Sequence, residues 1–130
     1  MMQNELKNNI NQSDSLGENV CDLKYLSDMM GGKKSLIQDI IDAFLKQIPE
    51  ELAGINEAVL NVDYANIRKI AHTMKSTVSI MGITTLTPIL IEMEKLGASA
   101  ANIEKIVQLN MKLDTICKKA INEIEKLNYI

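Results

Sequence analysis

Apolar residues recur every three to four positions from Val20 onward, and no segment shows the two-residue alternation of a strand. This period predicts amphipathic helices, each of which buries one face. Only two prolines and six glycines interrupt the 130-residue chain, whose apolar residues are mostly Leu, Ile, Met and Ala. Such residues serve helix packing, whereas sheets draw more on aromatic and β-branched side chains. The chain is therefore predicted to be all-α.

The first two helices are predicted before residue 62. A short helix starts near Val20 and ends at the glycine pair 31–32, where glycine suits a C-cap. The second helix has an apolar stripe over residues 37–59, with Pro49 inside it. Proline lacks an amide donor and crowds the preceding turn, so we expect a kink or break near Gln47-Ile48. The two glutamates after Pro49 would then lie in a new first turn, where negative charge is favourable.

Three further helices are predicted over residues 63–82, 84–97 and 101–127. Asp63 is the expected N-cap of the first, and either Thr84 or Thr85 is the expected N-cap of the second. Gly82 and Gly97 are expected to end these two helices, because glycine readily adopts the left-handed conformation of a C-cap.

Helices joined by short loops pack as antiparallel neighbours, so the predicted fold is a bundle of about four main helices. A chain of this length forms one domain, which we assign to residues 20–130. Residues 1–19 are rich in Asn and poor in large apolar groups, which predicts a disordered tail. No apolar run is long enough for a secretory signal or a membrane span, so we expect a cytoplasmic protein that has no membrane partner.

The charge and the side-chain inventory argue against several classes of function. A net charge of −3 and the scarcity of aromatic residues disfavour a nucleic-acid partner. One histidine and two distant cysteines, Cys21 and Cys117, cannot build the usual metal sites of helical bundles, so no metal or other cofactor is expected in the chain. The cysteines are expected to be small buried thiols, although their positions leave a disulfide open.

The single histidine, His72, lies in a local reversal of charge. Residues 64–91 contain no Asp or Glu, while Arg68, Lys69 and Lys75 give this 28-residue stretch a charge of +3. A neutral imidazole is a nucleophile, and nearby cations can pair with the oxygens of a phosphoryl group. These residue types predict a histidine that holds a phosphoryl group. The chain has no Gly-rich phosphate loop, so any metal and the second phosphoacceptor must come from a partner.

A helical wheel places His72 on the exposed face of its helix, about 140° from the core stripe. On the same side lie Lys75, Arg68 and Ser79, at about 80–120°, and Ser76 lies at about 180°. The serines are small, so a partner's active site could reach the ring. For Arg68, contact with a partner and a role in solubility are equally good interpretations.

The segment around His72 resembles the histidine-containing phosphotransfer (HPt) domain family. The family motif is roughly Ala-His-x-Leu-Lys-Gly, followed by a glycine and a Leu-rich helix that contains Leu-Glu. The matching residues here are Ala71-His72-Thr73-Met74-Lys75-Ser76, Gly82, Leu86 and Met93-Glu94. Residues 44–50 and 62–63 are also similar, and the resemblance covers residues 20–127. Met74 replaces a leucine and is nearly isosteric with it. Ser76 replaces a glycine; its side chain is still small, but the added hydroxyl is expected to narrow access to the ring and so to affect which partners can bind.

The resemblance implies an antiparallel four-helix bundle with a short N-terminal packing helix. It also implies that His72 is the phosphoacceptor and that Lys75 stabilises the phosphate, and we expect Arg68, Ser76 and Ser79 to contact the partner. That partner would be a response-regulator receiver domain or a hybrid sensor kinase, whose acidic pocket holds Mg²⁺ and a phosphorylatable aspartate. The positive stretch is complementary to such a pocket. The reactive face must remain open, which predicts a monomer.

Three functions are compatible with these residues. A phosphorelay carrier is modified and regenerated by its partners and is therefore not an enzyme. A scaffold would dock a receiver-like or helical partner without phosphotransfer. A free-standing hydrolase is disfavoured, because no general base or metal ligand accompanies His72 in the sequence.

Overall fold

The computed structural model describes residues 20–127. They form five helices: α1 (Leu23–Met29), α2 (Lys34–Leu60), α3 (Tyr64–Ile80), α4 (Leu86–Ser99) and α5 (Ile103–Leu127). No strand occurs in this part of the chain, so the all-α prediction is confirmed. The predicted tail, residues 1–19, lies outside the described residues.

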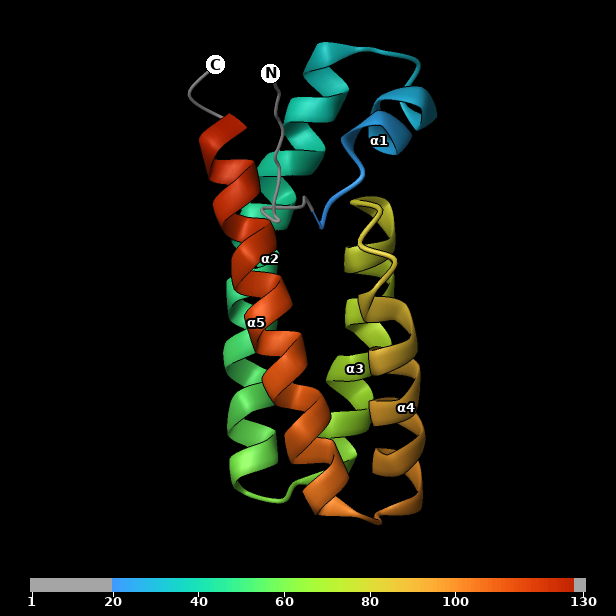
Figure 1. Ribbon diagram of the computed structural model, residues 1–130, viewed down its shortest axis with the longest axis vertical. Coiled ribbons are helices and arrows are strands. Elements are labelled where there is room, and N and C mark those ends of the chain that lie inside the picture. The colour runs from blue at the N-terminus through green and yellow to red at the C-terminus, as the bar shows by residue number, and fades with distance from the viewer. Residues whose placement is uncertain (1–19, 128–130) are drawn as a thin grey trace, which may run out of the picture.

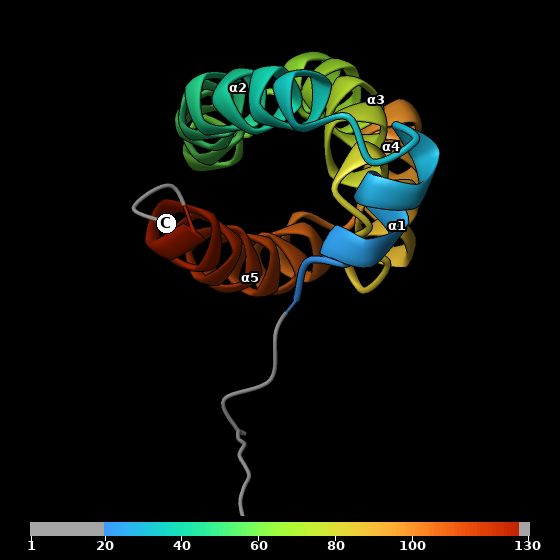
Figure 2. The same ribbon diagram turned by 90° about the horizontal axis from the view of Figure 1, so that it is seen from above.

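The four long helices form an antiparallel bundle (Figures 1 and 2). Helix α3 packs between α2 and α4, and α5 closes the ring against α4 and α2. The connections at residues 61–63, 81–85 and 100–102 are too short for anything but an antiparallel return. The short α1 lies across the end of α3 and α4, as the view from above shows (Figure 2).

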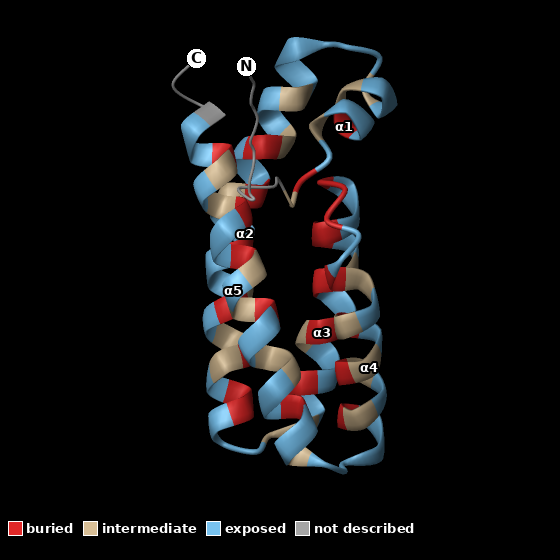
Figure 3. Ribbon diagram, in the orientation of Figure 1, coloured by how far each residue is buried: buried red, intermediate tan, exposed pale blue. Residues whose placement is uncertain are grey.

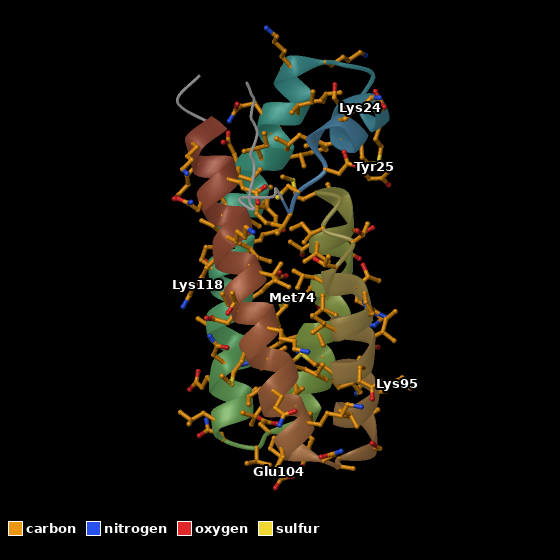
Figure 4. All side chains as sticks on the ribbon, in the orientation of Figure 1. Lys24, Tyr25, Met74, Lys95, Glu104 and Lys118 are labelled. Atoms are coloured by element: carbon orange, nitrogen blue, oxygen red, sulfur yellow. The ribbon has the colours of Figure 1, made fainter. Side chains whose placement is uncertain are left out.

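The apolar stripes of all five helices meet in one core. Buried positions follow the inward side of each long helix (Figure 3), and the labelled Met74 points into the space between the helices (Figure 4). Complete burial of a Leu, Ile or Met side chain contributes about 1.5–3 kcal/mol. The largest fully buried side chains are Leu26, Ile48, Ile55, Ile67, Met74, Met81, Ile83, Leu86, Leu90, Met93, Ile106 and Leu113.

Pro49 does not interrupt α2. The helix runs from Lys34 to Leu60, so Glu50 and Glu51 lie in its interior, and the predicted break with a new first turn was wrong. Pro49 is exposed, so the carbonyl group that loses its amide partner can be hydrated. Packing of the buried stripe outweighs the local cost of the proline; its members on both sides of residue 49 are Ile41, Phe44, Ile48, Leu52 and Ile55.

Gly97 does not end α4, contrary to the prediction. The helix continues to Ser99 and ends at Ala100, which adopts the left-handed conformation with φ of 52°. Gly97 is buried where α4 crosses α3. A Cβ atom there would lie 2.9 Å from the backbone nitrogen of Arg68 and 3.0 Å from the carbonyl oxygen of Tyr64. The glycine thus permits close approach of two helix backbones, a role that a one-dimensional pattern does not distinguish from a C-cap.

Local capping fixes the ends of the helices around the site. Asp63 is the N-cap of α3, as predicted, and accepts a hydrogen bond from the backbone N–H of Asn66 at 3.2 Å. Thr85 occupies the N-cap position of α4 without a side-chain hydrogen bond. At the other end of α3, Gly82 has φ of +66°, and a Cβ atom there would lie 2.6 Å from Asp22 Cβ. The turn after α3 therefore needs glycine, both for its backbone conformation and for its contact with the segment before α1.

Cys21 and Cys117 are free and buried, as predicted for small apolar thiols. Burial raises the pKa of each thiol to about 12. The thiolate is the reactive form, so we expect neither cysteine to be alkylated in the folded protein at neutral pH and both to react after denaturation. Intact-mass measurement after iodoacetamide treatment checks this. Modification of the folded protein at the rate of a free thiol would contradict it.

No helix within residues 20–127 combines the length and the apolar character that crossing a bilayer requires.

Candidate functional site

His72 lies in the middle of α3, on the side opposite to its buried stripe. The inward positions of this helix are Ile67, Ala71, Met74, Thr77 and Val78. The side chain of His72 is 66% exposed, which confirms the orientation that the helical wheel predicts. The ring is therefore accessible to a macromolecular partner from solvent.

A carboxylate from the neighbouring helix holds the imidazole. His72 Nδ1 lies 2.8 Å from Glu94 Oε2, and Lys75 Nζ lies 2.6 Å from Glu94 Oε1. Glu94 thus uses one oxygen for each of the two α3 side chains. Helix α4 therefore supplies, beside the predicted cations, an acid that the charge pattern of residues 64–91 does not contain.

The protonation state of Glu94 determines which ring nitrogen is free. Hydrogen bonds from Lys75 and then from His72 lower the pKa of the Glu94 carboxyl, so it is ionised at neutral pH. An ionised carboxylate can only accept a hydrogen bond, so Nδ1 must carry the proton that it donates. In the neutral ring, Nε2 then bears the lone pair and is the nucleophilic atom.

The remaining predicted residues lie along the same exposed face but do not form one cluster. Ser76 is exposed and lines a hollow together with His72. Ser79 is exposed and lines a different hollow, which includes Tyr25 of α1. Arg68 is exposed one turn before His72. Lys75 is half-buried and, in this unphosphorylated protein, pairs with Glu94.

The hollow beside His72 lies between α2 and α3 and has a volume of about 430 Å³. From α2 it is lined by Gln47 and Glu51; from α3 it is lined by His72, by Ile80 and by the hydroxyl-bearing side chains of Thr73, Ser76 and Thr77. Thr77 donates a hydrogen bond to Glu51 Oε2 at 3.3 Å. The histidine therefore has an acid on each side of α3, one on α4 and one on α2.

Sequence reasoning missed the roles of both acids. Glu94 was noted only as part of the family motif, yet it continues the i, i+4 row of Leu86 and Leu90 and so lies at the edge of the face that meets α3. Glu51 was expected in the first turn of a new helix. Its approach to His72 depends on the register between two helices, which no pattern along a single helix contains.

The family comparison agrees with the fold. The Hpt domain family matches residues 39–122, which include most of α2, all of α3 and α4, and most of α5. No curated protein and no solved structure is significantly similar to the chain. An all-α helical bundle is the architecture of Hpt domains. The chain belongs to the Hpt domain family, whose members carry phosphoryl groups in two-component signalling and are not themselves catalysts.

Removal of the charge on Glu94 is expected to slow phosphoryl uptake. In Glu94→Gln the ring loses the carboxylate that selects its Nδ1–H tautomer, and Lys75 loses its ion pair, so we expect a loss of about tenfold or more in rate. Single-turnover labelling measures the rate, and ¹⁵N NMR of the ring reports the tautomer.

Glu92→Gln is the matched control for this change. Glu92 is on the same helix and pairs with Lys105 at 3.4 Å, away from the histidine. The same change of charge there should leave the rate and the tautomer as they are. Equal rates for the wild type and Glu94→Gln would contradict the proposed role of Glu94.

Proposed function

We propose that this protein is a phosphorelay carrier whose His72 receives a phosphoryl group from the aspartyl phosphate of a receiver domain and passes it to another. The observation that carries the proposal is the orientation of the ring: Nδ1 is held by Glu94, so Nε2 is the free nucleophile on a side chain that is 66% exposed. Membership of the Hpt domain family supports the same role.

In the proposed transfer, the Nε2 lone pair attacks the phosphorus of the aspartyl phosphate. The N–P bond forms while the P–O bond breaks, and its electron pair leaves with the aspartate carboxylate. The Nδ1 proton stays between the ring and Glu94, whose negative charge balances the positive charge that the ring gains. Lys75, at i+3 from His72, is placed to pair with a phosphoryl oxygen. Mg²⁺ is expected in the acidic pocket of the receiver, and this chain needs no cofactor of its own.

The surface near His72 suits a receiver domain. Arg68, Ser76 and Ser79 are exposed along α3, and the serines leave the approach to the ring unobstructed. Ile80, which is 41% exposed, borders a second hollow between α2 and α3, with a volume of about 230 Å³. An apolar contact next to a reactive polar group is typical of a docking surface. The proposed complex contains one copy of this chain and a receiver domain, either free or within a hybrid kinase.

Phosphoryl capture from a receiver tests the proposal. The purified protein is incubated with a phosphorylated receiver domain and Mg²⁺, and the product is analysed by intact mass and by ³¹P NMR. We expect one acid-labile, alkali-stable phosphate on Nε2. Binding of receivers without transfer, by a folded protein, would favour the scaffold function instead. Continuous release of phosphate by the chain alone would indicate a hydrolase.

A further inference from the structure

The His72 ring lies between a carboxylate of one helix and a hollow beside another. Nδ1 is turned toward Glu94 on α4, and α3 has α2 on its other side. His72 also borders the hollow shared with α2, which is the space beside the ring that a phosphoryl group on Nε2 can enter. This hollow, of about 430 Å³, is larger than several water molecules and can hold a phosphoryl group with its hydration.

The hollow has an unusual charge for a phosphoryl site. Its lining contains no Lys or Arg, and Glu51 is its single acidic residue. Lys75, which lies at i+3 from His72 and is proposed above to pair with a phosphoryl oxygen, does not line the hollow and must leave Glu94 to reach such an oxygen. An ionised Glu51 would therefore repel the oxygens of a phosphoryl group on Nε2, with no lining cation to screen the repulsion.

Glu51 is also poorly solvated as an anion. Oε2 accepts one hydrogen bond, from Thr77, while Oε1 is buried and has no partner among the described residues. Burial raises the pKa of Glu51 above its ordinary value, and the hydrogen bond from Thr77 offsets this only in part. A proton on Glu51 would thus relieve both the burial of its charge and its repulsion of a phosphoryl group.

We propose that Glu51 regulates how long a phosphoryl group remains on His72: its ionised carboxylate drives the group off, and uptake of a proton by Glu51 retains it. The inference rests on the proposed function, because it requires a phosphohistidine at position 72. Transfer to Nε2 forms the N–P bond as described above, and Glu51 takes one proton from solvent as the phosphoryl charge enters the hollow. When water attacks the phosphorus, a P–O bond forms and the N–P bond breaks, its electron pair returns to Nε2, the group leaves as inorganic phosphate, and Glu51 returns that proton to solvent.

Few other groups can produce such a pH dependence. From α3, Thr77 and His72 face Glu51. From α5, the Cys117 thiol is close enough for its pKa to respond to Glu51, but burial raises that pKa to about 12, so the thiol carries no charge. Glu94 of α4 does not line the hollow. Glu51 is thus the acid whose ionisation changes the charge of the hollow itself.

The lifetime of the phosphohistidine tests the inference. The protein is loaded with phosphoramidate, a small phosphoryl donor that needs no receiver, and loss of the label is followed between about pH 5 and pH 9. We expect the label on Glu51→Gln to last about threefold to tenfold longer than on the wild type near pH 8. This ratio should fall toward one as the pH is lowered and the wild-type Glu51 takes up its proton, because burial raises the pKa of this carboxyl. Acid-catalysed loss of phosphohistidine affects the variant and the wild type alike, so it cancels in the ratio of their lifetimes at each pH.

Glu50→Gln is the matched control, because it removes the same charge from an exposed adjacent position on α2. Its lifetime ratio should stay near one at every pH. In the wild type, ¹³C NMR should show Glu51 titrating at higher pH after loading than before it, a result that does not depend on the folding of a variant. Equal lifetimes for Glu51→Gln and the wild type, or an unchanged titration of Glu51, would overturn the inference. Loading by phosphoramidate without capture from any receiver would instead overturn the proposed function.

Discussion

His72→Gln is expected to abolish phosphoryl capture completely while leaving the bundle folded. Glutamine has no nucleophilic nitrogen, so no N–P bond can form. The side chain is largely exposed and belongs to no part of the core, so the free energy of unfolding should change by no more than about 0.5 kcal/mol. Labelling by a phosphorylated receiver measures the first effect, and thermal unfolding followed by circular dichroism measures the second.

The same pair of proteins separates the carrier from the scaffold. A carrier loses its signalling function in His72→Gln, although the variant should still bind the receiver, since the surrounding α3 surface is unchanged. A scaffold would keep its function in the variant. Acid-labile, alkali-stable phosphate on His72→Gln would show that another residue is the acceptor and would refute the assignment.

Gly97→Ala is expected to destabilise the protein strongly. The new Cβ atom would lie 2.9 Å from the Arg68 nitrogen and 3.1 Å from Arg68 Cα. These are backbone atoms of α3 and cannot rotate away, so α4 must move. We expect a loss of about 2–3 kcal/mol, which corresponds to a fall in Tm of about 5–10 °C for a domain of this size. Chemical and thermal unfolding measure it.

Displacement of α4 should also affect the phosphoacceptor. Glu94 lies one turn before Gly97, and its contacts with His72 and Lys75 depend on the spacing of α3 and α4. Phosphoryl uptake by Gly97→Ala should therefore be slower even where the protein remains folded.

Gly54→Ala is the matched control, since Gly54 also lies inside a helix. Its added Cβ atom would meet the end of the flexible Ile70 side chain at 3.3 Å. Alanine favours helix by about 1 kcal/mol over glycine, so this variant should be as stable as the wild type or more stable. A loss of stability as large as that of Gly97→Ala would mean that close backbone approach is not what Gly97 provides.

The features that could be predicted are those which repeat along one helix. The apolar stripes of α2, α3 and α5 and the exposure of His72 follow from the 3.6-residue period, and the N-cap role of Asp63 follows from its side-chain chemistry. Pro49 and Gly97 were misjudged because propensity describes an isolated segment. Tertiary packing outweighs it in α2, and α4 uses its glycine to approach α3 closely.

The sequence by itself determined the class of the protein and its helices and predicted the nucleophile, because these depend on residue type and on spacing within one segment. Only the tertiary structure decided the environment of that nucleophile. Residues 64–91 carry a charge of +3, yet α4 brings Glu94 to Nδ1 and α2 brings Glu51 to the hollow beside the ring. The physical reason is that electrostatic energy depends on distances in space, and the distance between two helices is set by how their side chains and backbones pack.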